Sequence, residues 1–224
     1  MKKASLEDAP EMVFYIRAHG GLTRDLFHSV ESGLQERTLS VHVDGPYGGL
    51  VEDVPALYET LVFVAGGSGI AACLPWIQHA VARVEKGGAI VRAIHLIWVV
   101  REPAHLQWIS NELDSITRRH PTLLQLHLFV TDKALSGVKV VPDDDSDGTP
   151  ASSVELDLGP VQNGRPYLPE LIPSLLSSSR RVLIFGCGPE GMRTDLCNAA
   201  AAAQRRVLAG EADVITLHTE FFGW

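Results

Sequence analysis

Two glycine-rich segments of the sequence carry residue types that can bind phosphate groups. The first, GGSG at 66–69, follows the apolar run LVFVA and precedes a segment that can begin a helix at Ile70. Glycines at the carboxyl end of a strand let backbone N–H groups approach an anion, and the start of a helix adds partial positive charge. This segment is therefore predicted to cradle a pyrophosphate, although an ordinary strand-to-helix turn would use the same residues.

The second segment, FGCGPEGM at 185–192, places Gly186, Gly188 and Pro189 after another apolar run. If both runs are strands of one parallel sheet, their turns meet at its carboxyl edge and border the crevice in which such sheets bind ligands. Cys187 would then face this crevice. The alternative is a buried structural thiol, which is the more common role of a lone cysteine.

A third apolar run, AIHLIWVV at 93–100, ends in Arg101 and Glu102. An acidic residue at this position binds the ribose hydroxyls of NAD, whereas an arginine pairs with the 2′-phosphate of NADP. Both residues can also be solvated charges, so the choice of dinucleotide stays open at this point. No Lys-Ser or Lys-Thr follows the first glycine segment and no GxSxG motif occurs, which disfavours a nucleoside triphosphatase and a hydrolase.

Two further segments contain residue types that can act in binding. GGLTRDL repeats the glycine pattern, with Gly21 before a helical segment and Thr23 able to donate a hydroxyl or simply to cap the helix. The sequence ends in EFFGW, in which the rings of Phe222 and Trp224 should pack on the edge of the core or on a flat cofactor ring. His218 precedes this segment and could form a dyad with Glu220.

The pattern of apolar runs predicts the fold. Five runs alternate with helical patterns, which is typical of a parallel sheet covered by helices on both faces. We therefore expect a doubly wound, five-stranded α/β fold. The predicted strands are Leu61–Ala65, Ala93–Val100, Leu123–Val130, Val182–Phe185 and Val214–Leu217. The predicted helices are Ile70–Val84, Ala104–Arg118 and a stretch opened by Pro189 that extends to Val207.

The remaining sequence predicts a division into two domains. Residues 1–50 contain two strand-like segments, Met12–Ala18 and Leu39–Asp44, around a helix at Leu22–Ser32. Residues 51–224 contain the alternating strands and helices, with a flexible acidic insertion around 132–163 that is too polar to pack.

Composition excludes several classes of function. The 224 residues carry a net charge of −8, so no basic face for nucleic acid is expected. The three cysteines lack metal-ligand spacing, which predicts neither a zinc site nor a disulfide framework. No apolar run reaches the roughly 20 residues that span a bilayer, so we expect the given chain to be soluble. Nothing in the sequence predicts its oligomeric state.

Taken in order, several segments resemble the C-terminal region of fungal ferric reductases and NADPH oxidases, within the ferredoxin reductase superfamily. These segments are IRAHGGLTRDL, VDGPYGG, FVAGGSGI, IWVVRE with LQWI, NGRP, FGCGPEGM and EFFGW. The resemblance implies that residues 1–50 are the last part of a flavin-binding β-barrel and that residues 51–224 form a ferredoxin reductase-type NADP-binding domain. It also implies a haem-bearing transmembrane domain as partner, and thus a place at the cytosolic face of a membrane.

The resemblance also gives roles to residues of the second domain. Arg101 and Arg165 would contact the phosphorylated adenosine end of NADPH, which favours NADPH over NADH. Cys187 would line the nicotinamide pocket. The other residues implied in binding NADPH are Gly66, Gly67, Ser68, Gly69 and Ile70 for the pyrophosphate, and Gly186, Gly188 and Pro189 around the nicotinamide.

For the flavin, the resemblance implies that Gly21 and Thr23 face the pyrophosphate of FAD. Phe222 or Trp224 would cover the flavin ring where the nicotinamide enters, so that these rings and Cys187 are the expected catalytic residues. The sequence departs from the family at Ala71, where a hydroxyl residue is usual, and lacks the Arg-x-Tyr/Phe-Ser/Thr segment that grips the flavin.

Two functions follow from the resemblance and its departures. In the first, the chain is an NADPH-dependent flavin oxidoreductase module that passes hydride to FAD, with electrons going on to haem and ferric iron in electron and iron transport. In the second, it is a noncatalytic NAD(P)-binding or interaction module without its own flavin. A methyltransferase that uses the same glycine turn for S-adenosylmethionine is disfavoured by the CGP turn and the aromatic end.

Overall fold

The computed structural model of the chain has two compact units, Met1–Gly49 and Leu50–Trp224. The structure describes residues 13–14, 16, 18, 20–31, 39–44, 52–132, 158–176 and 179–220.

The first unit contains one helix among its described residues, α1 (Leu22–Glu31). The helix follows Gly21, whose φ of +57° is a left-handed conformation that glycine adopts without strain. The helix predicted from the spacing of its apolar residues is thus confirmed. The strands predicted at Met12–Ala18 and Leu39–Asp44 are wrong for the residues that the structure describes there, since none of them is in a strand. A strand needs a partner strand, and alternation of apolar residues alone does not supply one.

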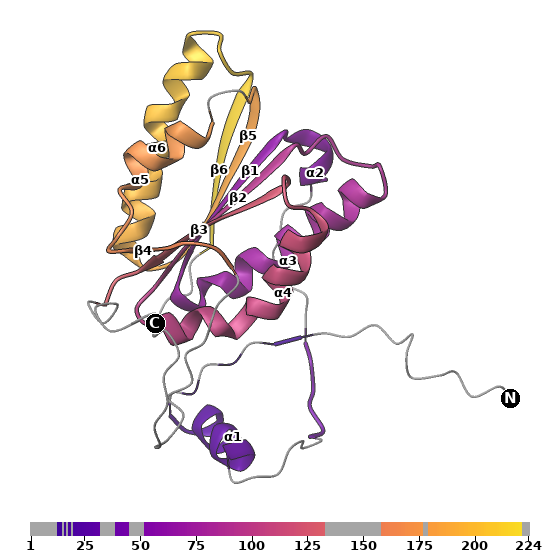
Figure 1. Cartoon of the computed structure of the whole chain (residues 1–224), viewed down its shortest axis with the longest axis vertical. Helices are drawn as coiled ribbons and strands as arrows, with labels where there is room; N and C mark the ends of the chain where they lie inside the picture. Colours follow the sequence, from indigo (N-terminus) through magenta and orange to yellow (C-terminus); the bar gives the residue numbers. More distant parts are fainter. Residues whose placement is uncertain are drawn as a thin grey trace, which may run out of the picture. The chain divides into compact units, whose positions relative to one another are not determined.

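The second unit is built on a parallel sheet of six strands in the order β4-β3-β2-β1-β5-β6 (Figure 1). The strands are β1 (Thr60–Gly66), β2 (Ala93–Val100), β3 (Leu124–Val130), β4 (Val161–Asn163), β5 (Arg181–Cys187) and β6 (Val214–Glu220).

Helices cover both faces of this sheet. Helices α3 and α4 lie on one face, and α5 and α6 lie on the other (Figure 1). The helices of the unit are α2 (Val54–Leu57), α3 (Ile70–Glu85), α4 (Ser110–Arg119), α5 (Leu168–Leu175) and α6 (Glu190–Leu208). Short 3₁₀ segments at Gly67–Gly69 and Pro103–Ile109 lead into α3 and α4. The doubly wound α/β fold predicted from the sequence is confirmed.

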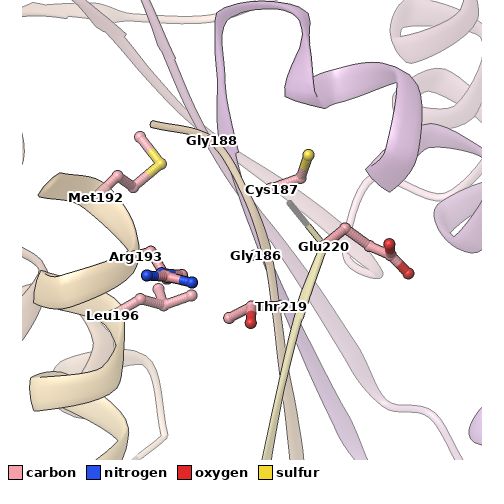
Figure 2. Close-up of a pocket in the computed structure, with 8 residues that line it drawn as sticks. All are labelled: Gly186, Cys187, Gly188, Met192, Arg193, Leu196, Thr219 and Glu220. Atoms are coloured by element: carbon pink, nitrogen blue, oxygen red, sulfur yellow. The ribbon is translucent and has the colours of Figure 1, made fainter. Parts of the chain in front are cut away.

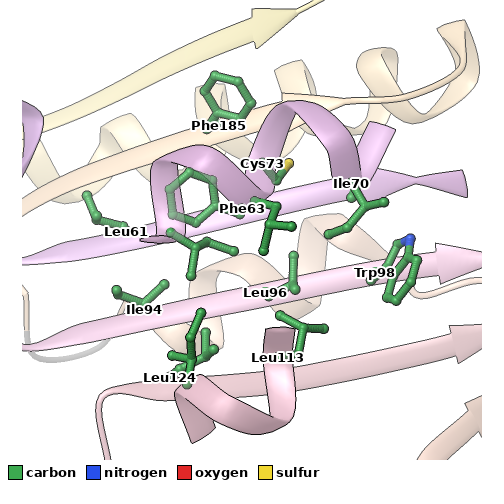
Figure 3. Packing of buried hydrophobic residues seen from close by; sticks show 14 of the residues in the cluster. Leu61, Phe63, Ile70, Cys73, Ile94, Leu96, Trp98, Leu113, Leu124 and Phe185 are labelled. Carbon is green, nitrogen blue, oxygen red and sulfur yellow. The ribbon is translucent and has the colours of Figure 1, made fainter. Parts of the chain in front are cut away.

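The central strands are apolar along their whole length because both faces of the sheet are covered. On β1, Leu61 and Phe63 pack into the core beneath α3 and α4, while Val62 and Val64 pack into the core beneath α5 and α6. Figure 3 shows the first of these cores around Phe63 and Leu96. Burial on both faces explains why the strands were visible in the sequence as continuous apolar runs.

The structure corrects the sequence prediction at two places. Strand β4 lies inside the segment predicted as an acidic insertion, and only three residues of it pair with β3, from Leu128 to Val130. A strand this short leaves no periodicity to detect. The helix predicted over Ala104–Arg118 begins instead as the 3₁₀ segment at Pro103 and becomes α-helical only at Ser110. Residues 133–157 of the predicted insertion lie outside the described residues.

Two histidines face each other across the neighbouring strands β2 and β3. Nδ1 of His95 lies 3.4 Å from Nε2 of His127, and the two ring centroids are 5.6 Å apart. Burial, and then the proximity of His127, lower the pKa of His95 to about 4. Burial also lowers the pKa of His127. The fold therefore favours the neutral form of this pair.

This pair predicts a loss of stability on acidification. A histidine in the unfolded chain has a pKa of about 6.5, so the unfolded chain takes up the proton first as the pH falls. The stability due to neutral His95 is then lost between about pH 6.5 and pH 4, which amounts to on the order of 2 kcal/mol near pH 4.5. Urea unfolding of the wild type and His95→Gln at about pH 7.5 and 4.5 should show a smaller pH dependence for the variant.

The matched control is His79→Gln, which replaces an exposed histidine of α3. It should keep the pH dependence of the wild type. Equal pH dependence of the wild type and His95→Gln would contradict the role of His95.

Candidate functional site

The order of the strands reverses between β1 and β5, which are neighbours in the sheet. From β1 the chain continues through β2, β3 and β4 toward one edge, whereas β5 and β6 lie on the other side of β1. Parallel sheets bind ligands in the crevice at such a switch point, outside the carboxyl ends of the strands. Both glycine-rich turns are found here, because β1 ends at Gly66 and β5 ends at Cys187. The structure thus brings together the two segments that the sequence analysis singled out.

The two turns touch each other through their backbones. A Cβ added at Gly69 would lie 2.1 Å from the carbonyl oxygen of Cys187, and a Cβ added at Gly66 would lie 2.7 Å from Cδ of Pro189. At Gly188 the added atom would lie 2.6 Å from Sδ of Met192. Real Cβ atoms essentially never approach this closely. Glycine at positions 66 and 69 therefore permits the two turns to pack against each other, and glycine at position 188 leaves room for the Met192 side chain of α6.

The outer side of the first turn is open. Gly67 has a φ of +54°, and an added Cβ there would meet nothing within 4 Å. Ser68 is exposed, whereas Ile70, at the start of α3, is buried. The N-cap of α3 is Gly69, and no side chain caps this helix end. The N–H of Ile70 donates to the carbonyl of Gly67, so an anion at this helix end is left to the neighbouring backbone N–H groups, which no side chain caps.

The second turn holds Cys187 in a buried position at the end of β5. Its side chain is 2% exposed, and burial followed by the negative charge of Glu220 raises the pKa of Cys187 to about 11. The thiol is therefore neutral near pH 7 and is not an activated nucleophile. A thiol in this state can shape a pocket, but it does not attack a substrate.

Strand β6 places a carboxylate beside this thiol. Cys187 and Glu220 are paired in the register of β5 and β6, and both side chains project away from α6 in Figure 2. Nε2 of His218 lies 3.1 Å from Oε1 of Glu220, and the His218 ring stacks on Phe185 at 5.3 Å. The structure thus forms the His218–Glu220 dyad and adds its proximity to Cys187, which the sequence analysis missed because register between strands cannot be read from one segment.

A narrow pocket lies on the other side of β5. It is lined by residues of α6, including Met192 and Arg193, and by Thr219 of β6 (Figure 2). Its volume of about 10 Å³ is enough for roughly one water molecule. This pocket does not hold a dinucleotide, so the open surface above the first turn is the better candidate.

Two arginines extend the candidate site along the same edge of the sheet. Arg101 follows β2, and its carbonyl accepts a hydrogen bond from the N–H of Asp132, which follows β3. Arg165 follows β4, where the N–H of Gly164 donates to the carbonyl of Val130. Both arginines are exposed. The ends of three neighbouring strands therefore present two cations, Arg101 and Arg165, and two carboxylates, Glu102 and Asp132.

Tyr167 is a residue of this edge that the sequence analysis missed. It precedes α5, two residues after Arg165, and its side chain is 64% exposed. An exposed aromatic ring near cationic groups is a surface on which a nucleotide base can stack. Its position after a three-residue strand gave no signal in the sequence.

The remaining predicted site residues belong to other parts of the chain. Gly21 and Thr23 lie in the first unit, where the Thr23 hydroxyl donates to the carbonyl of Gly20 at 3.3 Å. Phe222 and Trp224 lie outside the described residues. The roles of these four residues toward a flavin stay predictions.

The described part of the chain contains no group of three or more His, Cys, Asp or Glu side chains that could hold a metal ion. None of its helices combines the length and the apolar character needed to cross a membrane.

The fold and the site together define a class of protein. A parallel sheet with two glycine turns at its switch point, an uncapped helix start and arginines at the neighbouring strand ends is a dinucleotide-binding domain. The model of the ferric reductase NAD binding domain matches residues 58–201, and the chain belongs to this family. The match includes both glycine turns, Arg101 and Arg165.

Curated relatives are ferric reductases and NADPH oxidases. Probable cell surface ferric reductase kap2 of Aspergillus oryzae (strain ATCC 42149 / RIB 40) is 30% identical over 127 residues, which cover 56% of this chain and 17% of the relative. NADPH oxidase 1 of Rattus norvegicus is 29% identical over 138 residues, which cover 57% of this chain and 24% of the relative. The chain thus spans less than a third of the length of either relative.

Two solved structures resemble the chain more distantly. The crystal structure of Amycolatopsis cytochrome P450 reductase GcoB has a TM-score of 0.47 and 20% identity, covering 80% of this chain and 42% of that chain. Ferredoxin-NADP+ reductase from Plasmodium falciparum with 2'P-AMP has a TM-score of 0.41 and 12% identity, covering 80% of this chain and 57% of that chain.

The resemblance drawn from the sequence motifs is confirmed by the family match and by the curated relatives. The chain is an NAD(P)-binding module of an oxidoreductase family.

The contact between the turns predicts a severe effect of one methyl group. Gly69→Ala places a Cβ against the backbone carbonyl of Cys187, which no side-chain rotation can relieve. We expect the free energy of unfolding to fall by more than about 3 kcal/mol, measured by urea denaturation. The control is Gly191→Ala in α6, where an added Cβ meets nothing within 4 Å. It should be neutral or stabilise by up to about 1 kcal/mol. Equal stability of the two variants would contradict the contact.

The proximity of Glu220 to Cys187 predicts a change in thiol reactivity. Glu220→Gln removes one of the two causes that raise the pKa of Cys187, so the thiolate fraction at a given pH should increase. The pKa should stay above its ordinary value, since burial is the larger cause. Alkylation by iodoacetamide, followed by mass spectrometry at several pH values, separates Cys187 from the exposed Cys197.

The control for this measurement is Glu190→Gln, which removes a carboxylate at the start of α6 that is not among the causes of the shift. It should leave the alkylation profile unchanged. A Glu220→Gln profile identical to that of the wild type would show that the carboxylate does not act on the thiol.

Proposed function

We propose that the chain is the NADPH-dependent flavin oxidoreductase module of a ferric or metal reductase. The observation that carries this proposal is the open first turn at Gly67 and Ser68, next to the uncapped start of α3 and in backbone contact with the Cys187 turn. The curated relatives, named as a ferric reductase and an NADPH oxidase, support the assignment to this kind of chemistry.

The residues present fit NADPH at three points. The backbone around Gly67 and Ser68 would bind the pyrophosphate, because this surface is open and carries helix-end N–H groups. Arg101 and Arg165 would bind the 2′-phosphate, for which guanidinium groups are well suited. Tyr167 is placed to stack on the adenine ring. The choice of NADPH over NADH rests on these two arginines.

The other end of the site would receive the nicotinamide. The chemistry that NADPH supplies when bound is hydride donation from C4 of its nicotinamide ring. Cys187, with Gly188 and Pro189, would shape the pocket for this ring. The thiol of Cys187 is neutral and nearly inaccessible to solvent, so it would not compete as a nucleophile. No acid or base of the protein is required for this step.

The acceptor of the hydride in this proposal is FAD. Gly21 and Thr23 would face its pyrophosphate, and Phe222 or Trp224 would cover its ring until the nicotinamide arrives. In the longer family architecture the electrons would continue to a haem-bearing transmembrane domain and to ferric iron, with this module at the cytosolic face of the membrane.

One observation favours a second candidate, a noncatalytic NAD(P)-binding module. The family match begins at residue 58, so it does not include the first unit, in which none of the described residues is in a strand. Such a module would bind NADPH at the same turn and arginines but would lack a flavin.

Nucleotide binding and turnover of the purified chain test the two candidates. We expect NADPH to bind more tightly than NADH, and Arg165→Gln to weaken NADPH binding about tenfold while changing NADH binding little. With excess FAD and ferricyanide, NADPH oxidation should exceed that of a protein-free control. Cys187→Ala should slow hydride transfer in stopped-flow measurements while the Kd for NADPH stays within about a few-fold.

The outcomes separate the candidates. Binding of NADPH without turnover would support the noncatalytic module. Binding of neither nucleotide would overturn both candidates.

A further inference from the structure

A buried tryptophan on β2, the strand next to β1, forms a hydrogen bond with the backbone of the first glycine turn. Trp98 lies near the carboxyl end of β2, paired in register with Ala65, and its side chain is fully buried (Figure 3). Its indole N–H donates a hydrogen bond of 3.0 Å to the carbonyl oxygen of Gly67. The backbone N–H of Ile70 donates to the same oxygen. Two donors inside the protein therefore fix the direction of this carbonyl.

The direction of this carbonyl determines where the next amide points. The carbonyl of Gly67 and the N–H of Ser68 belong to one planar trans peptide group, in which C=O and N–H point in opposite directions. Because the carbonyl points inward to Trp98 and Ile70, the Ser68 N–H points outward. The outer side of the turn is open, since Ser68 is exposed and a Cβ added at Gly67 meets nothing within 4 Å.

The hydrogen bond also opposes rotation of this peptide group. Gly67 has no side chain that would restrict its conformation, and it already has a positive φ. A flip of the peptide would leave the buried indole N–H without its acceptor, and a buried polar group without a partner is strongly disfavoured. The turn is thus held in one orientation before any ligand arrives, which lowers the loss of conformational freedom on binding.

We propose that Trp98 is a positioning residue of the dinucleotide site, which aims the Ser68 N–H at the diphosphate through its hydrogen bond to Gly67. This inference rests on the proposed binding of NADPH at the turn. If Trp98 acts in this way, its indole N–H increases the affinity for ligands that contain a diphosphate. It does not change the affinity for ligands that occupy only the adenosine end of the site.

Two ligands and one substitution test this role. Trp98→Phe keeps an aromatic ring in the core and removes the N–H. NADP+ contains the diphosphate, whereas 2′-AMP carries the 2′-phosphate and lacks the diphosphate. By isothermal titration calorimetry we expect the variant to bind NADP+ about fivefold more weakly than the wild type and 2′-AMP within about twofold of it.

The control substitution is Trp76→Phe on α3, where the Trp76 ring packs against Phe185 at 6.1 Å. It makes the same chemical change at a partly buried position and should leave the ratio of the two affinities unchanged. Equal weakening of both ligands by Trp98→Phe, or no weakening of either, would overturn the positioning role. Absence of NADP+ binding by the wild type would instead overturn the proposed function on which the role rests.

A measurement on the wild-type chain keeps the test independent of how well the variant folds. Hydrogen exchange of the Trp98 indole N–H, followed by NMR, reports the opening of its bond to Gly67. We expect NADP+ to slow this exchange and 2′-AMP to leave it unchanged. Equal exchange rates with and without NADP+ would overturn the proposal.

Discussion

The candidate site depends on the direct contact between the backbones of two turns. The carbonyl oxygen of Cys187 occupies the place where a side chain at position 69 would begin. The two turns pack against each other at the ends of the neighbouring strands β1 and β5. The glycines are therefore required by packing as well as by backbone freedom. This contact also places the start of α3 and the Cys187 turn at one point of the sheet.

Electrostatic attraction at the site is local. The chain has a net charge of −8, so its overall field repels an anionic dinucleotide. Two features of the site favour an anion, namely the backbone N–H groups at the start of α3 and the two arginines after β2 and β4. The Cys187 end of the site does not favour negative charge, since burial and Glu220 both disfavour a thiolate. The site thus combines an end suited to phosphate with an end that keeps its sulfur neutral.

Much of the fold could be predicted because its signals are local. The strands of the central sheet are buried on both faces, so each appeared as an apolar run, and the glycine turns marked where helices begin. Strand β4 was missed because three residues show no period, and the contact between Glu220 and Cys187 was missed because it depends on strand register. The segment at Leu39–Asp44 shows the opposite error, since its alternation suggested a strand without a partner strand. Local pattern reveals an element, whereas pairing and register are set by the rest of the fold.

The order of the strands also has a consequence for folding. Strand β1 pairs with β2 soon after it in the chain, but its other neighbour, β5, begins roughly 120 residues later, as the pairing of Thr60 with Val182 shows. Contacts between distant parts of a chain form slowly, because a large loop must close before they are gained. The two turns meet only when this loop has closed. Occupancy of the site by a nucleotide therefore reports that the most distant pairing of the described sheet is complete, and a nascent chain that ends before β5 lacks the Cys187 turn against which the first turn packs.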